Sequence, residues 1–176
     1  MPEPDQQQIK FVFDTTLLSN FAAVSQVVLL EQLYKGQACT TLMVVEELER
    51  GIYAGYRWLQ AVEEILTPLR PTGWLPILAL EAAEEKRLYA ELAPPLGPGE
   101  AACLAVAFVR GLTLGSDDWA ARDAAKGRHV RLTGTLGILI RAVREGHWSL
   151  DMANSVLAQM IAKRYRSPVD RLNDLV

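Results

Sequence analysis

"GLTLGSDDWAARDAAKG", residues 111–127, contains an apolar run, a short Gly-Ser turn and an alanine-rich polar run in immediate succession. The apolar run is typical of a buried strand, and the run from Trp119 onward is typical of a helix. Two adjacent aspartates, Asp117 and Asp118, stand between them. Adjacent carboxylates repel each other, and capping this helix needs only one of them. The stretch therefore predicts a strand followed by a helix, and it leaves one carboxylate to be explained.

The same alternation of short apolar runs and helical patterns extends along the chain in both directions from this stretch. Strands are expected at 9–13, 38–41, 112–116 and 129–133. Helices are expected at 16–24, 26–36, 42–51, 95–111, 118–127, 134–146, 149–165 and 167–176. This alternation predicts an α/β protein with a mostly parallel sheet and helices on both faces. In such sheets, active sites lie at the carboxyl ends of the strands.

Extra helices are expected in the middle of the chain and at its end. Residues 52–95 are predicted to form a helical insertion, with helices at 56–66 and 78–92 and a loop around Pro68–Pro76. C-terminal helices are expected over about 149–176, the last of them with Ser167 as its N-cap. A chain of 176 residues is most simply one domain, so we predict a single domain over residues 1–176.

Composition and charge narrow the class of protein. Half of the residues are hydrophobic and 22% are charged, which excludes a disordered chain. Residues 1–109 hold seven Lys/Arg against fourteen Asp/Glu, whereas residues 110–176 hold eleven against seven. The C-terminal part is thus net basic within a chain of net charge −3. This asymmetry either favours an anionic partner or belongs to a solvated helical surface.

Cysteine usage and hydropathy bear on the compartment. Cys39 and Cys103 lie far apart without C-x-x-C spacing and are interpreted as small core residues in a reducing environment. The N-terminal "MPEPDQQQ" lacks the basic and apolar regions of a signal peptide. No apolar run reaches the roughly 18 residues that a membrane span requires. We expect a soluble, cytoplasmic protein without membrane contact.

Four acidic positions each have an ordinary structural interpretation. Asp14 follows the first strand and suits an N-cap, while Glu47 suits an exposed helical position. Glu100 lies in the first turn of its helix, where the helix dipole favours a carboxylate. Capping likewise explains one of Asp117 and Asp118. Each interpretation is sufficient for its own residue.

Taken together, the same acids predict a metal site. A parallel sheet places Asp14 and Asp117 at the same carboxyl edge, with Glu100 on a helix that begins there. Clustered carboxylates raise one another's pKa unless a cation neutralises them. Mg²⁺ and Mn²⁺ prefer carboxylate and water oxygens, and no His/Cys spacing suggests zinc. Such a site positions water and stabilises charge on a phosphate.

The order of five motifs resembles that of PIN-domain proteins. The motifs are "FVFDTT", "VVEEL", "GPGEAACLAVA", "GSDDWAARDAAKG" and "VRLTGTLGIL". They are most similar to a prokaryotic branch with a DD-x-x-A-R element followed by T-G-T-L-G, and more distantly similar to the toxin ribonucleases of VapBC modules. The resemblance implies a Rossmann-like three-layer α/β/α sandwich, often dimeric, with the activity of a Mg²⁺- or Mn²⁺-dependent endoribonuclease. A toxin function restrained by a small antitoxin protein is a further hypothesis.

The resemblance also implies which residues are functional. The acidic quartet of the family corresponds to Asp14, Glu47, Glu100 and Asp117, with Asp118 beside it. The implied metal ligands are Asp14, Glu100, Asp117 and Asp118. Glu46 is adjacent to Glu47, and the sequence leaves open which glutamate and which aspartate of each pair is functional. A PIN-fold binding or scaffold protein with little catalysis is the alternative, and retention of all four acids favours the enzyme.

Three polar residues near the acids are candidates for substrate binding or support. Thr133 and Thr135 follow a strand and open a helix, where they either face a metal-bound water or phosphate or serve as N-caps. Arg122 lies one helical turn beyond Asp118. It either contacts an RNA phosphate or holds a carboxylate in place.

The middle of the chain carries apolar residues that a small sandwich does not obviously need. They are Trp58, Trp74, Leu75, Ile77 and Leu78. Large exposed apolar patches mark interfaces, so a homodimer is expected. The alternative is that these residues complete a larger core.

Overall fold

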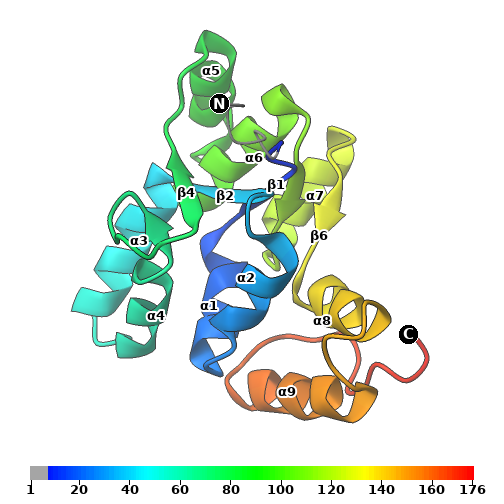
Figure 1. The fold of residues 1–176 in the computed structure, drawn as a ribbon. Helices are drawn as coiled ribbons and strands as arrows, with labels where there is room; N and C mark the ends of the chain where they lie inside the picture. The colour runs from blue at the N-terminus through cyan, green and yellow to red at the C-terminus, as the bar shows by residue number, and fades with distance from the viewer. Residues whose placement is uncertain (1–7) are drawn as a thin grey trace, which may run out of the picture.

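The computed structural model describes residues 8–176, so the expectation that rests on the N-terminal stretch lies outside the described residues, apart from Gln8. Within the described chain, six short strands form one sheet in the order β3-β4-β2-β1-β5-β6 (Figure 1). The strands are β1 (Phe11–Phe13), β2 (Ala38–Thr41), β3 (Leu66–Thr67), β4 (Leu75–Leu78), β5 (Thr113–Gly115) and β6 (Leu132–Thr133). Every neighbouring pair is parallel. The predicted α/β fold with a parallel sheet is confirmed.

Helices follow the strands in alternation. They are α1 (Thr15–Ala23), α2 (Val27–Tyr34), α3 (Leu42–Tyr53), the 3-10 helix η1 (Arg57–Leu59), α4 (Gln60–Glu63), α5 (Ala83–Leu92), α6 (Pro98–Arg110), α7 (Trp119–Gly127), α8 (Thr135–Arg144) and α9 (Leu150–Ala162). α6 begins with Pro98 at its first position and ends at Gly111 in the left-handed conformation, as a proline start and a glycine stop favour. No helix within residues 8–176 combines the length and apolar character needed to span a membrane.

The order of the strands distributes the helices over both faces of the sheet. The chain moves from β1 to β2 in one direction along the sheet and from β4 to β5 to β6 in the other. Parallel crossovers are right-handed, so α1 and α2 cover one face and α6 and α7 the other. α8 and α9 pack against α1 at the end of the sheet where its strands terminate (Figure 1). The result is three layers, with the centre of the sheet covered on both sides.

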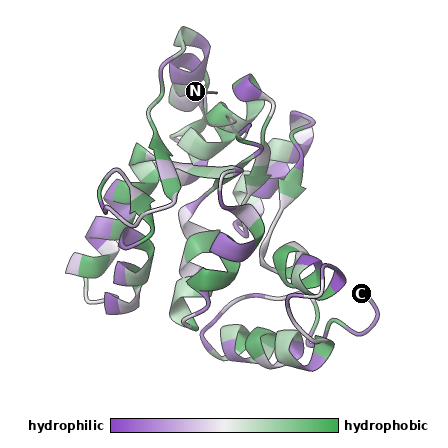
Figure 2. Cartoon of the chain, viewed as in Figure 1, coloured by the Kyte–Doolittle hydropathy of each residue, from purple (hydrophilic) through white to green (hydrophobic). Residues whose placement is uncertain are grey.

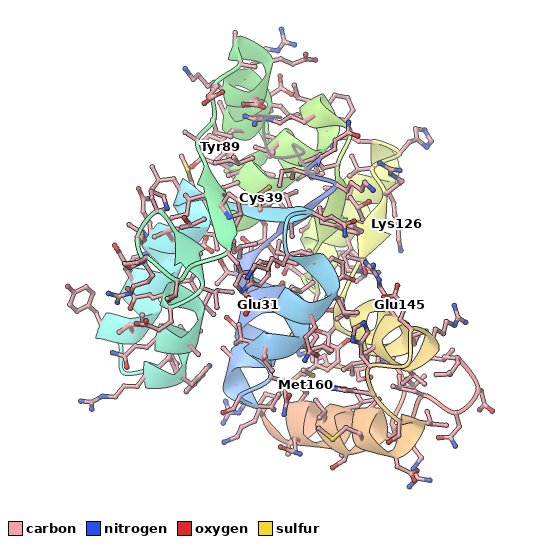
Figure 3. The ribbon with its side chains drawn as sticks, viewed as in Figure 1. Glu31, Cys39, Tyr89, Lys126, Glu145 and Met160 are labelled. Atoms are coloured by element: carbon pink, nitrogen blue, oxygen red, sulfur yellow. The ribbon has the colours of Figure 1, made fainter. Side chains whose placement is uncertain are left out.

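β1 is the centre of the core. Phe11 and Phe13 point to one face and stack edge-on against Tyr34 of α2, with ring centroids 4.9 and 5.1 Å apart. Cys39 and Cys103 are fully buried and reduced, as expected for core residues. Figure 3 shows Cys39 in the middle of the sheet and Lys126 at the periphery. Hydrophobic residues gather on the strands and on the helix faces that cover them (Figure 2). Burial of this apolar surface is the main stabilising term for the fold.

Residues 52–95 contain helices in both predicted ranges, η1 with α4 and α5, but they are not helical throughout. They supply β3 and β4 to the sheet, and β4 pairs with β2 through Thr40 and Ile77. The helix expected at 78–92 begins only at Ala83. The strand β4 was not predicted because it contains a proline, which has no N–H to donate to a sheet. Pro76 pairs with Thr67 of the two-residue edge strand β3, and the next residue, Ile77, pairs with β2 on the other side. Residues 66–78 of this segment therefore form one edge of the sheet, through β3 and β4.

The helix expected at 167–176 is absent from the structure. Ser167 does not cap a helix, because its hydroxyl donates to the Val169 carbonyl at 2.6 Å and accepts from the Val169 N–H at 3.3 Å. Leu172 is fully buried, and its N–H donates to Asn154 Oδ1 of α9 at 2.8 Å. Tertiary contacts thus outweigh the local capping pattern, and residues 163–176 run back along α8 and α9 as an irregular segment.

Candidate functional site

The predicted acidic residues lie on elements that meet at the carboxyl edge of the sheet. Asp14 directly follows β1, and Asp117 follows β5, its neighbour in the sheet. Glu47 lies on α3, which follows β2, and Glu100 lies in the first turn of α6. The structure separates these acids into two parts. We call Asp14, Glu47, Glu100 and Asp118 the acidic group, and Asp117 with its hydrogen-bond donors the Asp117 network.

Asp14 is the most deeply buried acid. It caps α1, and its Oδ1 accepts from the Leu17 N–H at 3.0 Å and from the Thr16 hydroxyl at 2.7 Å. Its Oδ2 is buried and has no hydrogen-bond partner within residues 8–176. Burial raises the pKa of Asp14 to about 7, and the Glu100 charge adds to this rise. The hydrogen bonds from Leu17 and Thr16 partly offset it, together with the nearby Ser116 hydroxyl, which does not complete a hydrogen bond to Oδ2. Oδ1 therefore stabilises the start of α1, whereas Oδ2 has no hydrogen-bond partner within the described residues.

Glu47 connects α3 to the start of α6. Its Oε1 accepts from the Gly99 N–H at 2.7 Å, and its Oε2 accepts from the Thr15 hydroxyl. A Cβ at position 99 would collide with this carboxylate, so only glycine permits the approach. Glu46 is exposed, so Glu47 is the glutamate of the pair that faces the site. Its contacts hold the N-terminal turn that carries Glu100.

Glu100 links the acids electrostatically. Partial burial raises its pKa, and the negative charges of Glu47 and Asp118 raise it further, with a backbone N–H partly opposing them. Glu100 also raises the pKa of Asp14. Glu100 is thus the member that connects the others, because Glu47 and Asp118 raise its pKa and its own charge raises the pKa of Asp14.

Asp117 is held by an unusually complete set of donors. Its Oδ1 accepts from the Thr135 N–H at 2.9 Å and from the Tyr165 hydroxyl at 3.5 Å. Its Oδ2 accepts from the Thr135 hydroxyl at 2.6 Å and from Asn20 Nδ2 at 2.9 Å. A carboxylate has about four lone-pair sites, so these four donors use all of them. In this arrangement Asp117 has no free acceptor for a metal ion.

The two adjacent aspartates cap two different helices. Asp118 caps α7, with Oδ1 accepting from the Ala121 N–H at 2.7 Å. Asp117 binds the N-terminus of α8 through Thr135, a helix whose own N-cap, Gly134, offers no side chain. A Cβ on Gly134 would lie 2.7 Å from Asp117 Oδ1, so glycine is required for this approach. Capping of α7 therefore explains only Asp118, as expected, and Asp117 is explained by its contact with the start of α8.

The remaining predicted residues have structural partners. Arg122 Nη1 donates to the Ser116 carbonyl at 2.8 Å and to the Thr133 carbonyl at 3.1 Å, so it ties the end of β5 to the end of β6. It contacts backbone rather than a carboxylate. Thr135 is fully buried in the Asp117 network, and Thr133 lines the adjacent pocket. Thr135 thus faces a protein carboxylate in this structure.

Sequence reasoning missed three residues of the Asp117 network. Thr16 accepts from the Asp117 N–H at 3.0 Å while it donates to Asp14, so it joins the two parts of the site. Asn20 lies one turn further along the same helix and contacts both Asp117 and Thr135. Tyr165 reaches Asp117 from the C-terminal segment. The i, i+4 spacing of Thr16 and Asn20 after Asp14 was the one signal for them.

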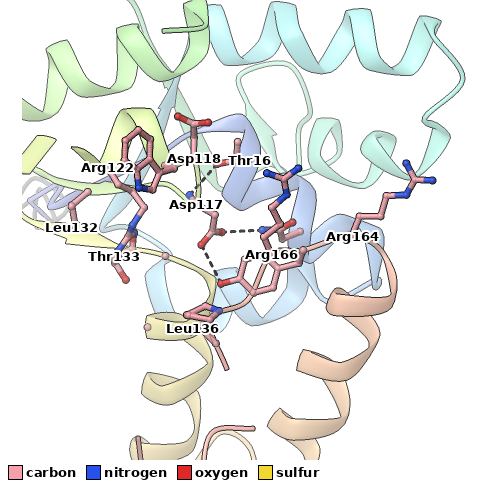
Figure 4. Close-up of a pocket in the computed structure, with 15 residues that line it drawn as sticks. Thr16, Asp117, Asp118, Arg122, Leu132, Thr133, Leu136, Arg164 and Arg166 are labelled. Atoms are coloured by element: carbon pink, nitrogen blue, oxygen red, sulfur yellow. Dashed lines mark hydrogen bonds between the residues drawn. The ribbon is translucent and has the colours of Figure 1, made fainter. Parts of the chain in front are cut away.

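A pocket of about 820 Å³ opens beside the Asp117 network (Figure 4). Its lining comes from the ends of β5 and β6, the starts of α1, α7 and α8, and the C-terminal segment. The lining residues are Thr16, Asn20, Asp117, Asp118, Trp119, Arg122, Leu132, Thr133, Gly134, Leu136, Gly137, Arg164, Tyr165, Arg166 and Pro168. The volume falls within the range of small-molecule and nucleotide sites. Asp118 belongs to both the pocket wall and the acidic group.

The acidic group suits a hard divalent cation, although its ligands are not assembled as a closed cage. Within residues 8–176, no three His, Cys, Asp or Glu side chains are grouped closely enough to hold a metal ion together. Mg²⁺, however, usually binds through one or two carboxylates and keeps several waters. The unpartnered Asp14 Oδ2 and the repulsion at Glu100 are the features that such an ion would relieve.

Comparisons with known proteins agree with this architecture. A family model described as a PIN domain matches residues 10–176. The chain is similar to the crystal structure of PAE2754 from Pyrobaculum aerophilum, with 15% identity and a TM-score of 0.53 over 78% of this chain and 98% of that chain. It is also similar to DNA-bound VapBC from Salmonella typhimurium, with 20% identity and a TM-score of 0.50 over 72% of this chain and 98% of that chain. No curated protein sequence matches the chain significantly. The two structures show the fold, the family model covers nearly the whole chain, and the chain belongs to the PIN domain family.

Proposed function

We propose that this chain is a divalent-metal-dependent nuclease that hydrolyses phosphodiester bonds of RNA, with Mg²⁺ or Mn²⁺ as its metal. The observation that carries the proposal is the buried Asp14 Oδ2, which has no partner within residues 8–176 and lies in a cluster of like charges. A buried, unpartnered carboxylate oxygen is costly unless a proton or a cation compensates it. PIN domains are generally nucleases, which supports a cation as the compensating species.

The proposal assigns separate roles to the acids. One or two of Asp14, Glu100 and Asp118 would hold the metal directly, with waters completing its shell, and the metal would supply positive charge next to the scissile phosphate. Glu47 positions Glu100 by fixing the Gly99 N–H at the start of α6. Asp117 orients α8 and, through Thr16, the Asp14 carboxylate. The structure thus favours Asp118 over Asp117 as the metal-facing aspartate of the pair.

Partners and location form the second part of the proposal. One structural neighbour is a VapBC assembly, which supports a small antitoxin protein as a partner of this chain. A cytoplasmic location fits such a module. The homodimer also stays a prediction, on weaker grounds than the sequence offered. Trp74 and Leu75, two of the five residues behind it, are buried in the core, whereas Trp58 remains 45% exposed.

The test is cleavage of a fluorescently labelled single-stranded RNA by the purified protein in Mg²⁺, in Mn²⁺ and in EDTA. Cleavage should require the metal and should be lost in the Asp14→Asn variant. Asn keeps the capping bond to Leu17, so the variant is expected to fold. The control is Asp123→Asn, which changes an exposed aspartate of α7 and should cleave as wild type. Folded wild-type protein that does not cleave this RNA, or a single-stranded DNA of the same sequence tested beside it, would favour the alternative, a PIN-fold binding or scaffold protein.

A further inference from the structure

The pocket beside Asp117 carries an aromatic side chain that the fold does not use. Trp119 is the first residue of α7, follows Asp118 directly and lines the pocket, yet 78% of it is exposed. It is the most exposed of the tryptophans whose exposure the described structure gives, compared with 45% for Trp58 and 6% for Trp74. Exposing a tryptophan forgoes the burial that normally accompanies so large an apolar surface. Its place on the rim of the pocket points to a planar ligand.

Two arginines of the C-terminal segment also line the pocket without stabilising the fold through their side chains. Arg164 and Arg166 line the pocket, are exposed, and make no side-chain hydrogen bond or salt bridge within the part of the chain that is described. Between them, Tyr165 turns inward to Asp117. In Figure 4, Arg166 extends toward the side of Thr16, whereas Arg164 points away from Asp117. Arg164 and Arg166 are thus cations that are unpaired within the described chain and line the pocket on either side of Tyr165 in the sequence. The guanidinium of Arg122, in contrast, donates its hydrogen bonds to backbone carbonyls.

Arg164 occupies a position where glycine would be the ordinary choice. α9 ends in a Schellman motif, with the Arg164 N–H donating to the Ile161 carbonyl and the Tyr165 N–H to the Met160 carbonyl, both at 3.0 Å. Arg164 holds the left-handed conformation of this motif, with φ of 76°. A side chain there is costly, and residues retained in such conformations cluster at functional sites. The turn therefore favours a role for the arginine side chain itself.

We propose that the pocket is the binding track for a single strand of the RNA substrate, with an unpaired base stacked on Trp119 and phosphates bound by Arg164 and Arg166. This inference rests on the proposed nuclease function and deepens it by naming the substrate form and the residues that position it. Aromatic stacking tolerates any base, and basic groups along a groove track the backbone, which is how single strands are bound without sequence readout. Asp118 joins this track to the acidic group.

The experiment measures binding in EDTA, so that it does not depend on cleavage. A labelled single-stranded RNA of ten nucleotides is titrated with protein at several salt concentrations, and anisotropy and tryptophan fluorescence are followed. Trp119→Ala should weaken binding about tenfold and abolish the fluorescence quench, without changing the dependence on salt. Trp58→Ala, an exposed tryptophan outside the pocket lining, should bind as wild type. A duplex RNA should not quench the fluorescence, because its bases are paired.

The arginines have a different signature. Each phosphate of a single strand that the protein no longer neutralises lowers the slope of log K against log salt by about 0.7, so Arg164→Gly/Arg166→Ala should lower it by about 1.4. Arg164→Gly alone should leave the melting temperature unchanged or raise it by a few degrees, because glycine suits the left-handed position. Misfolding therefore cannot explain its weaker binding. Arg57→Ala, an exposed arginine with no salt bridge in the described chain, is the matched control.

The outcomes separate this inference from the proposed function. RNA that binds with these signatures but is not cleaved in Mg²⁺ or Mn²⁺ supports the binding track and overturns the nuclease. RNA that is cleaved while Trp119→Ala and Arg164→Gly/Arg166→Ala bind it as tightly as wild type, with the same salt slope, overturns the binding track alone. The absence of any binding by wild type at about 50 mM salt also overturns it.

Discussion

Asp14 and Asp117 follow neighbouring strands at the same edge of the sheet, yet their carboxylates are in opposite situations. Asp117 accepts four hydrogen bonds and has no acceptor site left. Asp14 is more deeply buried, leaves Oδ2 without a partner in the described chain and has its pKa raised to about 7. The position of an acid at a strand end therefore does not fix its role. The number of hydrogen-bond donors around the carboxylate decides that role.

A single hydroxyl joins these two situations. Thr16 Oγ1 donates to Asp14 Oδ1 at 2.7 Å and accepts from the Asp117 N–H at 3.0 Å. The satisfied Asp117 network thus holds in place the acid that is not satisfied. This is the arrangement expected of a preorganised site, in which residues without a chemical role fix those that have one.

The largest expected effect concerns Glu100, whose pKa is raised by the charges of Glu47 and Asp118 and whose own charge raises the pKa of Asp14. Glu100→Gln should lower RNA cleavage about 1,000-fold, equivalent to about 4 kcal/mol of transition-state stabilisation. In EDTA its melting temperature should be equal to or above that of wild type, because repulsion from Glu47 and Asp118 is relieved. Mg²⁺ at 100 times its Kd should stabilise wild type by about 2.7 kcal/mol and the variant by less.

The control for this comparison is Glu46→Gln, which removes a charge from the exposed neighbour of Glu47. It should match wild type in cleavage and in the stabilisation by Mg²⁺. Wild-type cleavage by Glu100→Gln, together with an unchanged metal effect on melting, would remove Glu100 from the mechanism.

The dependence of stability on pH should report the unpartnered carboxyl of Asp14. Its folded pKa of about 7 lies above the unfolded value near 4, so between these pH values the native state binds more protons than the unfolded state. Metal-free wild type should therefore lose up to a few kcal/mol of unfolding free energy as the pH rises from about 4 to about 7. Urea unfolding in EDTA at several pH values measures this.

Asp14→Asn isolates this contribution from those of other groups. The variant should lack the Asp14 part of the pH dependence and should be more stable than wild type above pH 7, where the buried charge is fully present in wild type. Parallel curves for the two proteins would show that Asp14 does not titrate in this range, and would contradict the contrast with Asp117.

A smaller effect should distinguish the two adjacent aspartates. Asp117→Asn places an NH₂ group against donors that already fill the site, so it should cost about 1–2 kcal/mol of unfolding free energy. Asp118→Asn should cost less than about 0.5 kcal/mol, because asparagine caps α7 equally well. Urea unfolding at pH 8 in EDTA compares them. Equal stability of the two variants would mean that the Asp117 network does not hold the fold together.

Much of the fold was predictable because it is encoded locally. The apolar run at Phe11–Phe13, the proline start and glycine stop of α6, and the strand–turn–helix around Asp117 all predict elements that the structure contains. β3 and β4 were missed because they are short, β4 contains Pro76 and β3 is followed directly by Pro68, so their pairing depends on a neighbouring strand already being present. The last ten residues failed for the same reason, since Asn154 decides the path of Leu172.

The site was predictable only in part. Strand ends indicated where Asp14 and Asp117 lie, because a parallel sheet places such residues at one edge. Their different environments were not predictable, since the donors come from far along the chain: Asn20 is 97 residues from Asp117, and Tyr165 is 48 residues away. No local sequence pattern predicts contacts between residues so far apart in the chain. The family resemblance located the acids, and only the structure shows which of them is already satisfied.

The smallest expected effect concerns Tyr165, the weakest of the four donors to Asp117. Its hydroxyl lies 3.5 Å from Asp117 Oδ1, at the limit of a hydrogen bond, whereas the three other donors lie between 2.6 and 2.9 Å. Tyr165→Phe keeps the ring and removes the hydroxyl, which contacts Asp117 and also interacts with the Leu136 backbone, so it should cost no more than about 0.5 kcal/mol in urea unfolding. Thr135→Val removes the 2.6 Å donor in the same network and should cost more, about 1–2 kcal/mol. If Tyr165→Phe were the costlier of the two, the C-terminal segment rather than the start of α8 would be what fixes Asp117, and the two parts of the site would depend on the last residues of the chain.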